Sequence, residues 1–329
     1  MTKIGIIGCG FVGSAVAAGF AQKADIKIYD KLKEGYDTIA DVCQQNIIFV
    51  CVPTPMRKTD NLPELSFVID ALRAIQSEIS QQPDPSAKIV VIKSTVLPGT
   101  CRELQRMFPD FHIVVNPEFL TARTARLDFI NTARVILGAE NQNALEVVIA
   151  AYRTILPHTH IYLCRWEEAE LLKYMSNCFF ALKISFLNEI FMICKRLGAD
   201  YNLIKKAWLA DGRIGNSHHD VPGHDGDVGF GGACFPKDVA AFVKWGELNN
   251  LPVETIAAAQ RLNNRIRVKR DWDVFDDEKA RAEMQAAQQQ AQIPPAERPQ
   301  AGDVEVLAPP PEETERPAPE KVPGEGQTK

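Results

Sequence analysis

The sequence lacks long uncharged apolar runs: its apolar stretches are strand-sized or interrupted by charge, so we expect no segment that spans a membrane. Its first residues, MTKIGIIGCG, enter a strand and a glycine turn without a signal-peptide core or cleavage site. The eight cysteines are scattered and show no pairing pattern, which is typical of proteins in a reducing cytosol. We therefore expect a cytoplasmic protein.

A basic stripe interleaved with aromatic residues is also lacking, so we expect no nucleic-acid partner. The net charge of −5 arises from residues 271–329, which hold 14 acids, 6 bases and 9 of the 21 prolines. This tail carries −8, so residues 1–270 carry +3. The tail is too polar and proline-rich to bury a core, and we predict that it is disordered, either as a tether or as a plain solvated tail.

The first 22 residues combine a strand, a glycine turn and a helix. In KIGIIGCGFVGSAVAAGFAQ, Gly8, Gly10 and Gly13 form G-x-G-x-x-G between an apolar strand and a helix of small residues. The first glycine allows the tight turn, the second lets a pyrophosphate approach the backbone, and the third lets the helix pack on the strand. Asp30 ends the next strand, where a carboxylate binds both ribose hydroxyls and repels a 2′-phosphate. This pattern predicts an NAD site; the alternative is a glycine turn of another α/β protein.

Further strand-like segments alternate with helical ones along the first half. Strands are expected at residues 46–52, 88–94, 112–117, 134–139 and 160–164, with helices including 65–80 and 144–155. This alternation predicts a Rossmann-like, doubly wound and mainly parallel sheet. Ligands bind beyond the carboxyl ends of such strands. The polar residues there are Thr54, Ser94, Thr95, Asn116 and Glu118. Any one of them is equally well a turn or cap residue.

The second half reads as helical. A long amphipathic helix is expected at residues 167–197, with Gly198 as its stop. Lys173 and Asn177 lie one turn apart on one face of it, among aromatic residues that make a solvated surface a poor explanation. Shorter helices follow at residues 201–211, 235–248 and 252–270. We therefore expect an α/β domain at 1–164, an all-helical central domain at 165–270 and the tail at 271–329.

The stretch GFGGACFPKD places Cys234 after glycines that let the backbone approach a ligand closely. Such a cysteine is either a small buried hydrophobe or a working nucleophile. We favour the nucleophile, with a low pKa supported by Lys173 and by a helix N-terminus at Pro236, and with ready alkylation.

Half of the six histidines lie in one loop. NSHHDVPGHDGD holds His218, His219 and His224, interleaved with aspartates. A metal site is one interpretation, but the spacing matches no zinc pattern, and glycine-rich loops more often bind substrates. We therefore predict no metal.

Seven segments, in order over residues 1–268, resemble the UDP-glucose/GDP-mannose dehydrogenase family. They are GIIGCGFVG, FVCVPTP, KSTVLPGT, NPEFLTARTARLDF, ELLKYMSNCFFALKISFLNEI, RIGNSHHDVPG and GFGGACFPKD. The resemblance implies an NAD-dependent, four-electron oxidation of a nucleotide-sugar C6 alcohol to a carboxylate, as from UDP-glucose to UDP-glucuronate, without release of the aldehyde.

The resemblance also implies a role for each matching residue. The Cys234 thiolate adds to the aldehyde as a thiohemiacetal, and loss of a second hydride gives a thioester that water hydrolyses. Lys173 and Asn177 stabilise the developing oxyanion. Asp238, four residues after the thiol, orients or deprotonates water.

Thr95 and Glu118 are expected to hold water or the reacting oxygen, whereas Lys237 is expected to be a loop or cap contact. The expected cofactor-binding residues are Gly8, Gly10, Phe11, Val12, Gly13, Asp30, Val52, Pro53, Thr54, Ser94 and Thr95. The expected substrate-binding residues are Glu118, Phe119, Leu120, Lys173, Asn177, Arg213 and Gly231.

The sequence departs from the family after residue 270. The family continues into a second Rossmann-like domain that holds the nucleotide end of the substrate, whereas here the acidic tail follows. Remote binding energy helps to position a reacting centre, so its loss weakens substrate binding or calls for a partner chain that supplies the domain. The resemblance also implies a homodimer through helices 167–197 and 252–270. The apolar rows there pack equally well within a monomer.

Three functions stay open. The first is a compact nucleotide-sugar 6-dehydrogenase, and the second is a dehydrogenase of a smaller sugar or hydroxy acid, which free UDP would not inhibit. The third is a non-catalytic module that binds NAD, which has no need of the complete set of reactive residues. We rank the three in this order.

Overall fold

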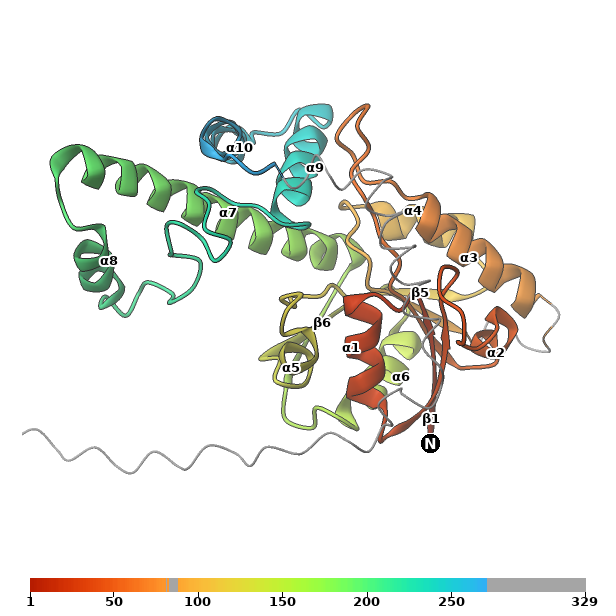
Figure 1. The fold of residues 1–329 in the computed structure, drawn as a ribbon. Coiled ribbons are helices and arrows are strands. Elements are labelled where there is room, and N and C mark those ends of the chain that lie inside the picture. The colour runs from red at the N-terminus through yellow and green to blue at the C-terminus, as the bar shows by residue number, and fades with distance from the viewer. Residues whose placement is uncertain (81, 83–87, 271–329) are drawn as a thin grey trace, which may run out of the picture. The chain divides into compact units, whose positions relative to one another are not determined.

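Seven short apolar strands form one sheet in the order β2-β1-β3-β4-β5-β6-β7 (Figure 1). They are β1 (Thr2–Ile7), β2 (Ala24–Tyr29), β3 (Ile47–Val50), β4 (Ile89–Ile92), β5 (His112–Val115), β6 (Arg134–Gly138) and β7 (His160–Cys164). Neighbouring strands are parallel except β5 and β6, which are antiparallel. The structure is a computed structural model that describes residues 1–80, 82 and 88–270. The prediction of a mainly parallel sheet is confirmed.

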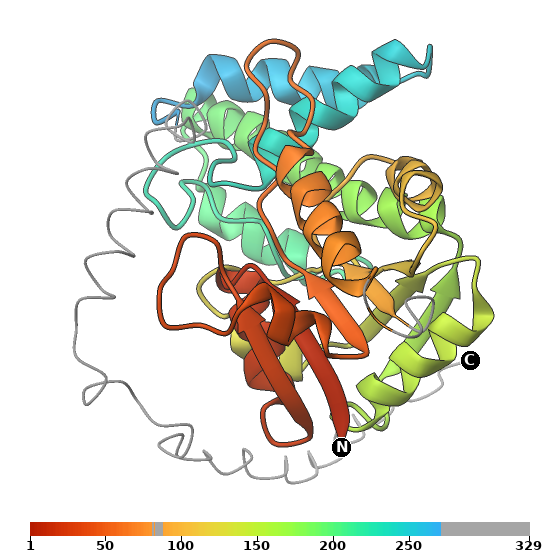
Figure 2. The same ribbon diagram turned by 90° about the vertical axis from the view of Figure 1, so that its right-hand side faces the viewer.

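Helices cover both faces of the sheet (Figures 1 and 2). One face carries α1 (Phe11–Phe20), α5 (Ala125–Ile130) and α6 (Gln142–Arg153), and the other carries α2 (Ile39–Cys43), α3 (Ser66–Ile79) and α4 (Thr100–Met107). Alternate strand residues separate two cores, so that Ile4 and Ile6 of β1 face the first group of helices and Ile7 faces the second. The sheet is therefore doubly wound, as expected.

The chain reverses its direction across the sheet at β1. From β1 it first passes outward to β2, and it then returns to β3 on the other side of β1 and continues towards β7. A parallel α/β sheet opens a crevice at the carboxyl ends of its strands where this reversal occurs. The turn after β1 and the strand-end residues of β3 and β4 meet there.

Four helices follow the sheet: α7 (Trp166–Leu197), α8 (Tyr201–Leu209), α9 (Phe235–Leu248) and α10 (Glu254–Ile266). A capping box of Arg165 and Glu168 starts α7, and Gly198, with φ of 69°, ends it in the left-handed conformation. Buried apolar residues pack α9 and α10 against α7, and α8 packs on its far end (Figure 1). The helical second half is confirmed.

The last of these helices is shorter than the expected 252–270. It ends at Ile266 because Arg267 is extended, and the guanidinium of Arg267 turns back to bind the Asp225 carboxylate at 2.5 Å. The N–H groups of Val268 and Lys269 are held by the Asp227 carboxylate at 3.1 and 2.7 Å. The loop before α9 therefore binds residues 267–269, which a longer α10 would have contained.

The most apolar stretch of α7 is less interrupted by charge than we expected. By length and composition α7 could cross a membrane, with a mean hydropathy of 1.4 in its most apolar window. One polar residue near its start, Glu170, is however buried against the sheet domain. The Glu170 carboxylate, 1% exposed, accepts hydrogen bonds from the N–H groups of Gly99 at 2.6 Å and Cys101 at 2.7 Å. In this structure α7 is a packed helix that joins the two halves.

The expected boundary between residues 164 and 165 falls where β7 ends and α7 is about to begin. The division of the chain into domains stays a prediction. The tail predicted at residues 271–329 lies outside the described residues.

Glu170 takes the place of a side-chain cap on α4, whose own N-cap, Gly99, has none. Glu170→Ala leaves two buried N–H groups unpaired, so we expect it to lower the free energy of unfolding by about 2–3 kcal/mol. Urea denaturation measures this, with Glu189→Ala, an exposed glutamate of the same helix, as the control. Equal stabilities of the two variants would contradict the capping role.

Candidate active site

Cys234 lies at the N-terminus of α9, half-buried, as its N-cap residue. One turn later, the backbone N–H of Asp238 donates to the carbonyl oxygen of Cys234 at 2.9 Å. The Asp238 side chain is almost fully buried, at 1% exposure. The predicted placement of Asp238 one helical turn beyond the thiol is confirmed.

Lys173 of α7 meets the segment that leaves β5. Its ammonium donates to the Glu118 carboxylate at 2.8 Å and to the Glu118 carbonyl oxygen at 2.7 Å, and both side chains are 6% exposed. Burial lowers the pKa of Lys173, but Glu118, Asp238 and Cys234 outweigh it and raise this pKa above the ordinary value. Lys173 is therefore a permanent cation at neutral pH.

Asn177, one turn further along α7, donates to the Asp238 carboxylate at 2.6 Å. The other oxygen of this carboxylate accepts from Lys237 at 2.5 Å. We had expected Lys237 to be a loop or cap contact; it instead forms a direct ion pair inside the cluster. Five charged or amide side chains from α7, α9 and the end of β5 thus surround the Cys234 region.

The low pKa expected for Cys234 is not found. Burial raises the pKa of this thiol, and the Asp238 and Glu118 carboxylates raise it further. The ammonium groups of Lys173 and Lys237 act in the opposite direction but do not prevail. The cluster therefore holds a neutral thiol, because two carboxylates oppose a third negative charge.

Strand-end hydroxyls join the loops after β3 and β4. Ser94 Oγ donates to the Val52 carbonyl at 2.6 Å, and Thr54 Oγ1 donates to the Thr95 carbonyl at 2.9 Å. These bonds fix the rim of the crevice and are the structural role that such residues often have. Binding of cofactor by Val52, Pro53, Thr54, Ser94 and Thr95 stays a prediction.

A second buried lysine, which the sequence did not single out, lies at the end of β4. Lys93 donates to the side-chain and backbone oxygens of Asn116 at 3.0 and 3.2 Å, and Tyr152 donates to the same side-chain oxygen. Burial lowers the pKa of Lys93 to about 8. Lys93 and Lys173 together fasten the segment 116–118, so the Glu118 position is set from both sides. The sequence signal was only a lysine in an otherwise apolar strand.

The glycine turn after β1 has the shape that a dinucleotide needs. Gly8 has φ of 90°, and a Cβ on Gly13 would lie 2.0 Å from the Gly8 carbonyl oxygen, so both positions require glycine. A Cβ on Gly10 would meet nothing within 4 Å, which leaves open space where a pyrophosphate approaches. The Asp30 carboxylate lies beside the turn and accepts from the Cys9 N–H at 2.7 Å. These residues fit NAD, and Phe11 and Val12 form the first turn of α1 at the same place.

Two predicted substrate residues adjoin the Lys173–Glu118 pair. The Phe119 ring lies 5.7 Å from the Lys173 ammonium, and the Leu120 N–H donates to the Glu118 carboxylate at 2.7 Å. Both hold the pair in place, and contact of either residue with substrate stays a prediction.

Arg213 is not part of this cluster. Its side chain is 89% exposed and pairs with Asp211. The nearby Gly215 carbonyl accepts from Lys183 at 2.5 Å, and Lys183 lies ten residues, about 15 Å, along α7 from Lys173. Arg213 therefore makes no contact with the side chains of the cluster in the described residues.

The glycines before Cys234 have a structural reason of their own. A Cβ on Gly231 would lie 1.9 Å from the Arg267 guanidinium, and one on Gly229 would lie 2.2 Å from the Asn263 amide oxygen. The open approach expected at 229 and 231 is thus filled by α10 and the residue after it. A Cβ on Gly232, with φ of 77°, would meet nothing, so open space is left only one step nearer to Cys234.

The histidine loop makes ordinary contacts. His218 stacks on Phe180 with ring centroids 4.0 Å apart, and His219 contacts Asn216 at 2.9 Å. Across the described ranges, no three His, Cys, Asp or Glu side chains gather as metal ligands would.

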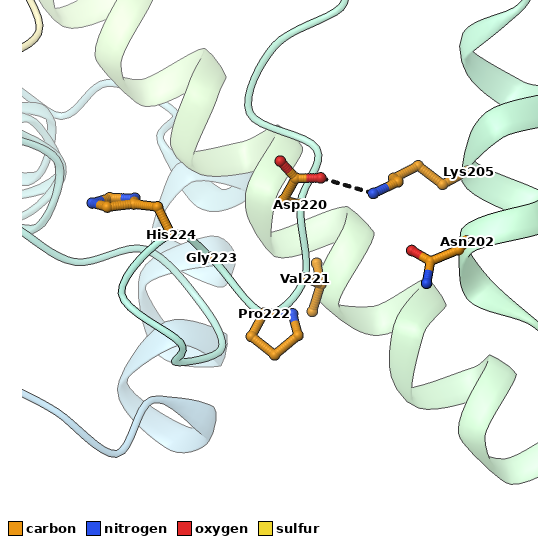
Figure 3. A pocket seen from close by; sticks show the side chains of 7 residues that line it. All are labelled: Asn202, Lys205, Asp220, Val221, Pro222, Gly223 and His224. Atoms are coloured by element: carbon orange, nitrogen blue, oxygen red, sulfur yellow. Dashed lines mark hydrogen bonds and ion pairs between the residues drawn. The ribbon is translucent and has the colours of Figure 1, made fainter. Parts of the chain in front are cut away.

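A cavity of about 390 Å³ opens between α8 and residues 220–224 (Figure 3). Its charged residues satisfy each other, since Lys205 of α8 pairs with Asp220 at 2.7 Å (Figure 3). It shares no residue with the cluster around Cys234. The reactive side chains therefore lie elsewhere.

The doubly wound sheet, its glycine turn and the helices around a thiol define a dinucleotide-binding α/β protein with a helical second domain. Two matches specify the class further. Residues 28–156 match the NAD binding domain, and residues 167–265 the central domain, of the UDP-glucose/GDP-mannose dehydrogenase family. The chain belongs to this family.

Relatives and solved structures agree with this assignment. The UDP-glucose 6-dehydrogenase of Rhizobium meliloti (strain 1021) is 31% identical over 80% of this chain and 67% of its own length. The UDP-glucose 6-dehydrogenase TuaD of Bacillus subtilis (strain 168) is 30% identical over 82% and 64%. The structure of a UDP-glucose dehydrogenase from Pyrobaculum islandicum superposes with a TM-score of 0.71 and 30% identity, over 80% of this chain and 68% of that one.

The chain is shorter than the curated relatives that it matches. It spans 30% of the length of an uncharacterized protein of Methanocaldococcus jannaschii, to which it is 33% identical over 74% of its own length. It spans 67% and 64% of the two named dehydrogenases. The match therefore covers the NAD binding and central domains.

The glycine turn allows folding to be separated from cofactor binding. Because a Cβ on Gly10 meets no protein atom, we expect Gly10→Ala to change the free energy of unfolding by at most about 1 kcal/mol. The same methyl group occupies the pyrophosphate position, so the Kd for NAD rises at least about tenfold. Gly13→Ala, whose Cβ would clash with the Gly8 carbonyl oxygen, lowers the free energy of unfolding and also raises the Kd for NAD. Urea denaturation and calorimetric titration measure the two effects, and unchanged NAD binding by Gly10→Ala would refute the assignment.

The raised pKa of Cys234 predicts slow alkylation at pH 7, because only the thiolate reacts. Asp238→Asn removes a negative charge and lowers this pKa, so iodoacetamide labelling at pH 8 accelerates by up to about tenfold, as for a shift of one pKa unit. Lys237→Met has the opposite effect. Labelling is followed on the Cys234 peptide by mass spectrometry, with Asp25→Asn, a distant exposed carboxylate, as the control. Fast labelling of Cys234 in the unmodified protein at pH 7 would contradict the raised pKa and support the low pKa predicted from the sequence.

Proposed function

We propose that the protein catalyses the NAD-dependent, four-electron oxidation of a nucleotide-sugar C6 alcohol to the carboxylate, with UDP-glucose as the substrate and UDP-glucuronate as the product. The observation that carries the proposal is the cluster of Lys173, Glu118, Asn177 and Asp238 around Cys234, drawn from three separate elements. Family membership and the names of the relatives support the same reaction.

The lysine–glutamate pair serves the first oxidation. Lys173, a permanent cation, holds the C6 oxygen and stabilises negative charge on it as its proton passes through a water molecule to solvent. Glu118 and Thr95 are the residues that we assign to holding this water or the reacting oxygen. NAD supplies the hydride acceptor for each of the two oxidations. The product of this step is the enzyme-held aldehyde.

The thiol and its carboxylate serve the second oxidation. Cys234 is neutral at rest, so its sulfur adds to the aldehyde carbon as its proton passes to Asp238, the adjacent carboxylate. Lys173 and Asn177 stabilise the oxygen of the resulting thiohemiacetal. Loss of the second hydride leaves a thioester. Asp238 first releases the thiol proton to solvent, then takes a proton from the attacking water and passes it to the departing sulfur, which restores the neutral thiol. The carboxylic acid that leaves ionises to the carboxylate.

The remaining contacts are proposed from their positions. The glycine turn, Asp30 and the rims of β3 and β4 bind NAD. Phe119 and Leu120 lie beside the cluster, and we assign them to the sugar, whereas the space beside Gly231 is filled by Arg267.

Substrate binding calls for a second copy of the chain. Leu171, Phe179 and Phe186 leave an apolar row on α7 that is 42%, 60% and 50% exposed, and a homodimer buries it. Arg213 is 89% exposed, and we assign it to the substrate held by such a partner. A separate chain that supplies a UDP-binding domain is the further partner that we propose. All eight cysteines are free thiols, which suits a cytoplasmic protein.

The reaction is tested by counting NADH per UDP-glucose consumed. We expect about two NADH per sugar, because the aldehyde stays bound for the second hydride transfer. Cys234→Ala abolishes this double oxidation. Cys194→Ala, which removes a free thiol of α7 away from the site, retains it. One NADH per sugar, or unchanged turnover of Cys234→Ala, would contradict the thioester route. No NADH with intact NAD binding would point to another substrate or to the missing partner chain, and the same assay with a panel of nucleotide sugars and with cell extract separates the two.

A further inference from the structure

Two arginines flank the first turn of α1. A cavity of about 240 Å³ is lined there by Phe11 and Ser14 of α1 and by Arg123 and Arg126 at the entry to α5. Both arginine side chains are exposed. Within the described part of the chain, neither forms a hydrogen bond or an ion pair. Two unpaired guanidinium groups at one cavity make it attractive to an anion.

The position of these arginines is fixed by close packing of α5 on α1. A Cβ on Gly19 of α1 would lie 2.3 Å from the Phe129 ring of α5, so glycine is what allows this approach. One oxygen of the nearby Asp128 carboxylate accepts from the Thr121 N–H at 2.7 Å and from the Thr124 hydroxyl at 2.9 Å. Asp128 thus braces the turn before α5, and within the described residues it forms no ion pair with either arginine.

The cavity adjoins the place where the cofactor pyrophosphate is expected. The first N–H groups of α1 have no partner within the helix, its first turn holds no acid, and Gly10 leaves open space before it. Guanidinium groups form paired hydrogen bonds with phosphate oxygens. The helix N-terminus alone leaves outward-facing oxygens of a pyrophosphate to solvent, and arginines beside the first turn can reach them.

We propose that Arg123 and Arg126 bind the pyrophosphate of NAD at the first turn of α1. The proposal rests on cofactor binding at the glycine turn. It adds two residues outside the motif to the cofactor site, and it places part of the affinity in exposed charges, so that salt weakens cofactor binding.

The test compares ADP-ribose with adenosine, which lacks the pyrophosphate, by calorimetric titration of the full chain. We expect Arg123→Gln and Arg126→Gln each to raise the Kd for ADP-ribose about tenfold, as for the loss of one charge-assisted hydrogen bond, and to leave adenosine binding unchanged. The double variant also shows a shallower dependence of this Kd on salt. Arg261→Gln, an exposed and equally unpaired arginine of α10, is the control.

Three results would overturn the proposal. ADP-ribose could bind the double variant as tightly as the unmodified protein. The variants could bind adenosine and ADP-ribose more weakly by the same factor, which would mean that the arginines shape the site and do not bind phosphate. Arg261→Gln could raise the Kd for ADP-ribose by the same factor, which would mean that the effect comes from the net charge of the protein. In each case, the unmodified protein still binds NAD and oxidises UDP-glucose if the proposed function is correct, so the two failures are distinguishable.

Discussion

The buried ion pair between Lys173 and Glu118 is the constraint on which the rest of the site depends. Burying two charges is costly unless each satisfies the other, and removal of one partner from such a pair typically costs about 3–5 kcal/mol. Its two ends come from α7 and from the segment after β5, so the pair holds the helical half against the sheet. Because Lys93 anchors the same segment from β4, the position of Glu118 is determined by two lysines on different elements.

The Cys234 thiol lies among charges of both signs, two carboxylates and two ammonium groups. Burial and the carboxylates of Asp238 and Glu118 raise the pKa of Cys234 and keep it protonated, and the neighbouring ammonium groups are placed to stabilise an oxygen anion. Such a thiol resists oxidation at rest, since the thiolate is the species that oxidants attack. In the reaction that we propose, it becomes nucleophilic as its proton moves to a neighbouring base, so the same residues would both protect the sulfur and activate it.

Local patterns in the sequence were enough to predict the sheet, the glycine turn and the long helix, because strand alternation, G-x-G-x-x-G and a terminal Gly198 each act over a few residues. Residues whose role depends on distant partners were missed. Lys93, Lys237 and Arg267 are defined by contacts with Asn116, Asp238 and Asp225, which no local spacing reveals. The low pKa predicted for Cys234 was wrong because burial, which local spacing does not reveal, raises the pKa of this thiol, and the Asp238 and Glu118 carboxylates raise it further.

The close packing of the Arg267 side chain against Gly231 limits which substitutions these two positions tolerate. A side chain at 231 would occupy the space of the guanidinium, and a shorter residue at 267 would leave the Asp225 carboxylate without its partner. Neither position can drift on its own without disturbing the loop that leads to the thiol. We therefore expect substitutions at 231 and 267 to occur together, because the loop before Cys234 and the residue after α10 pack as one unit.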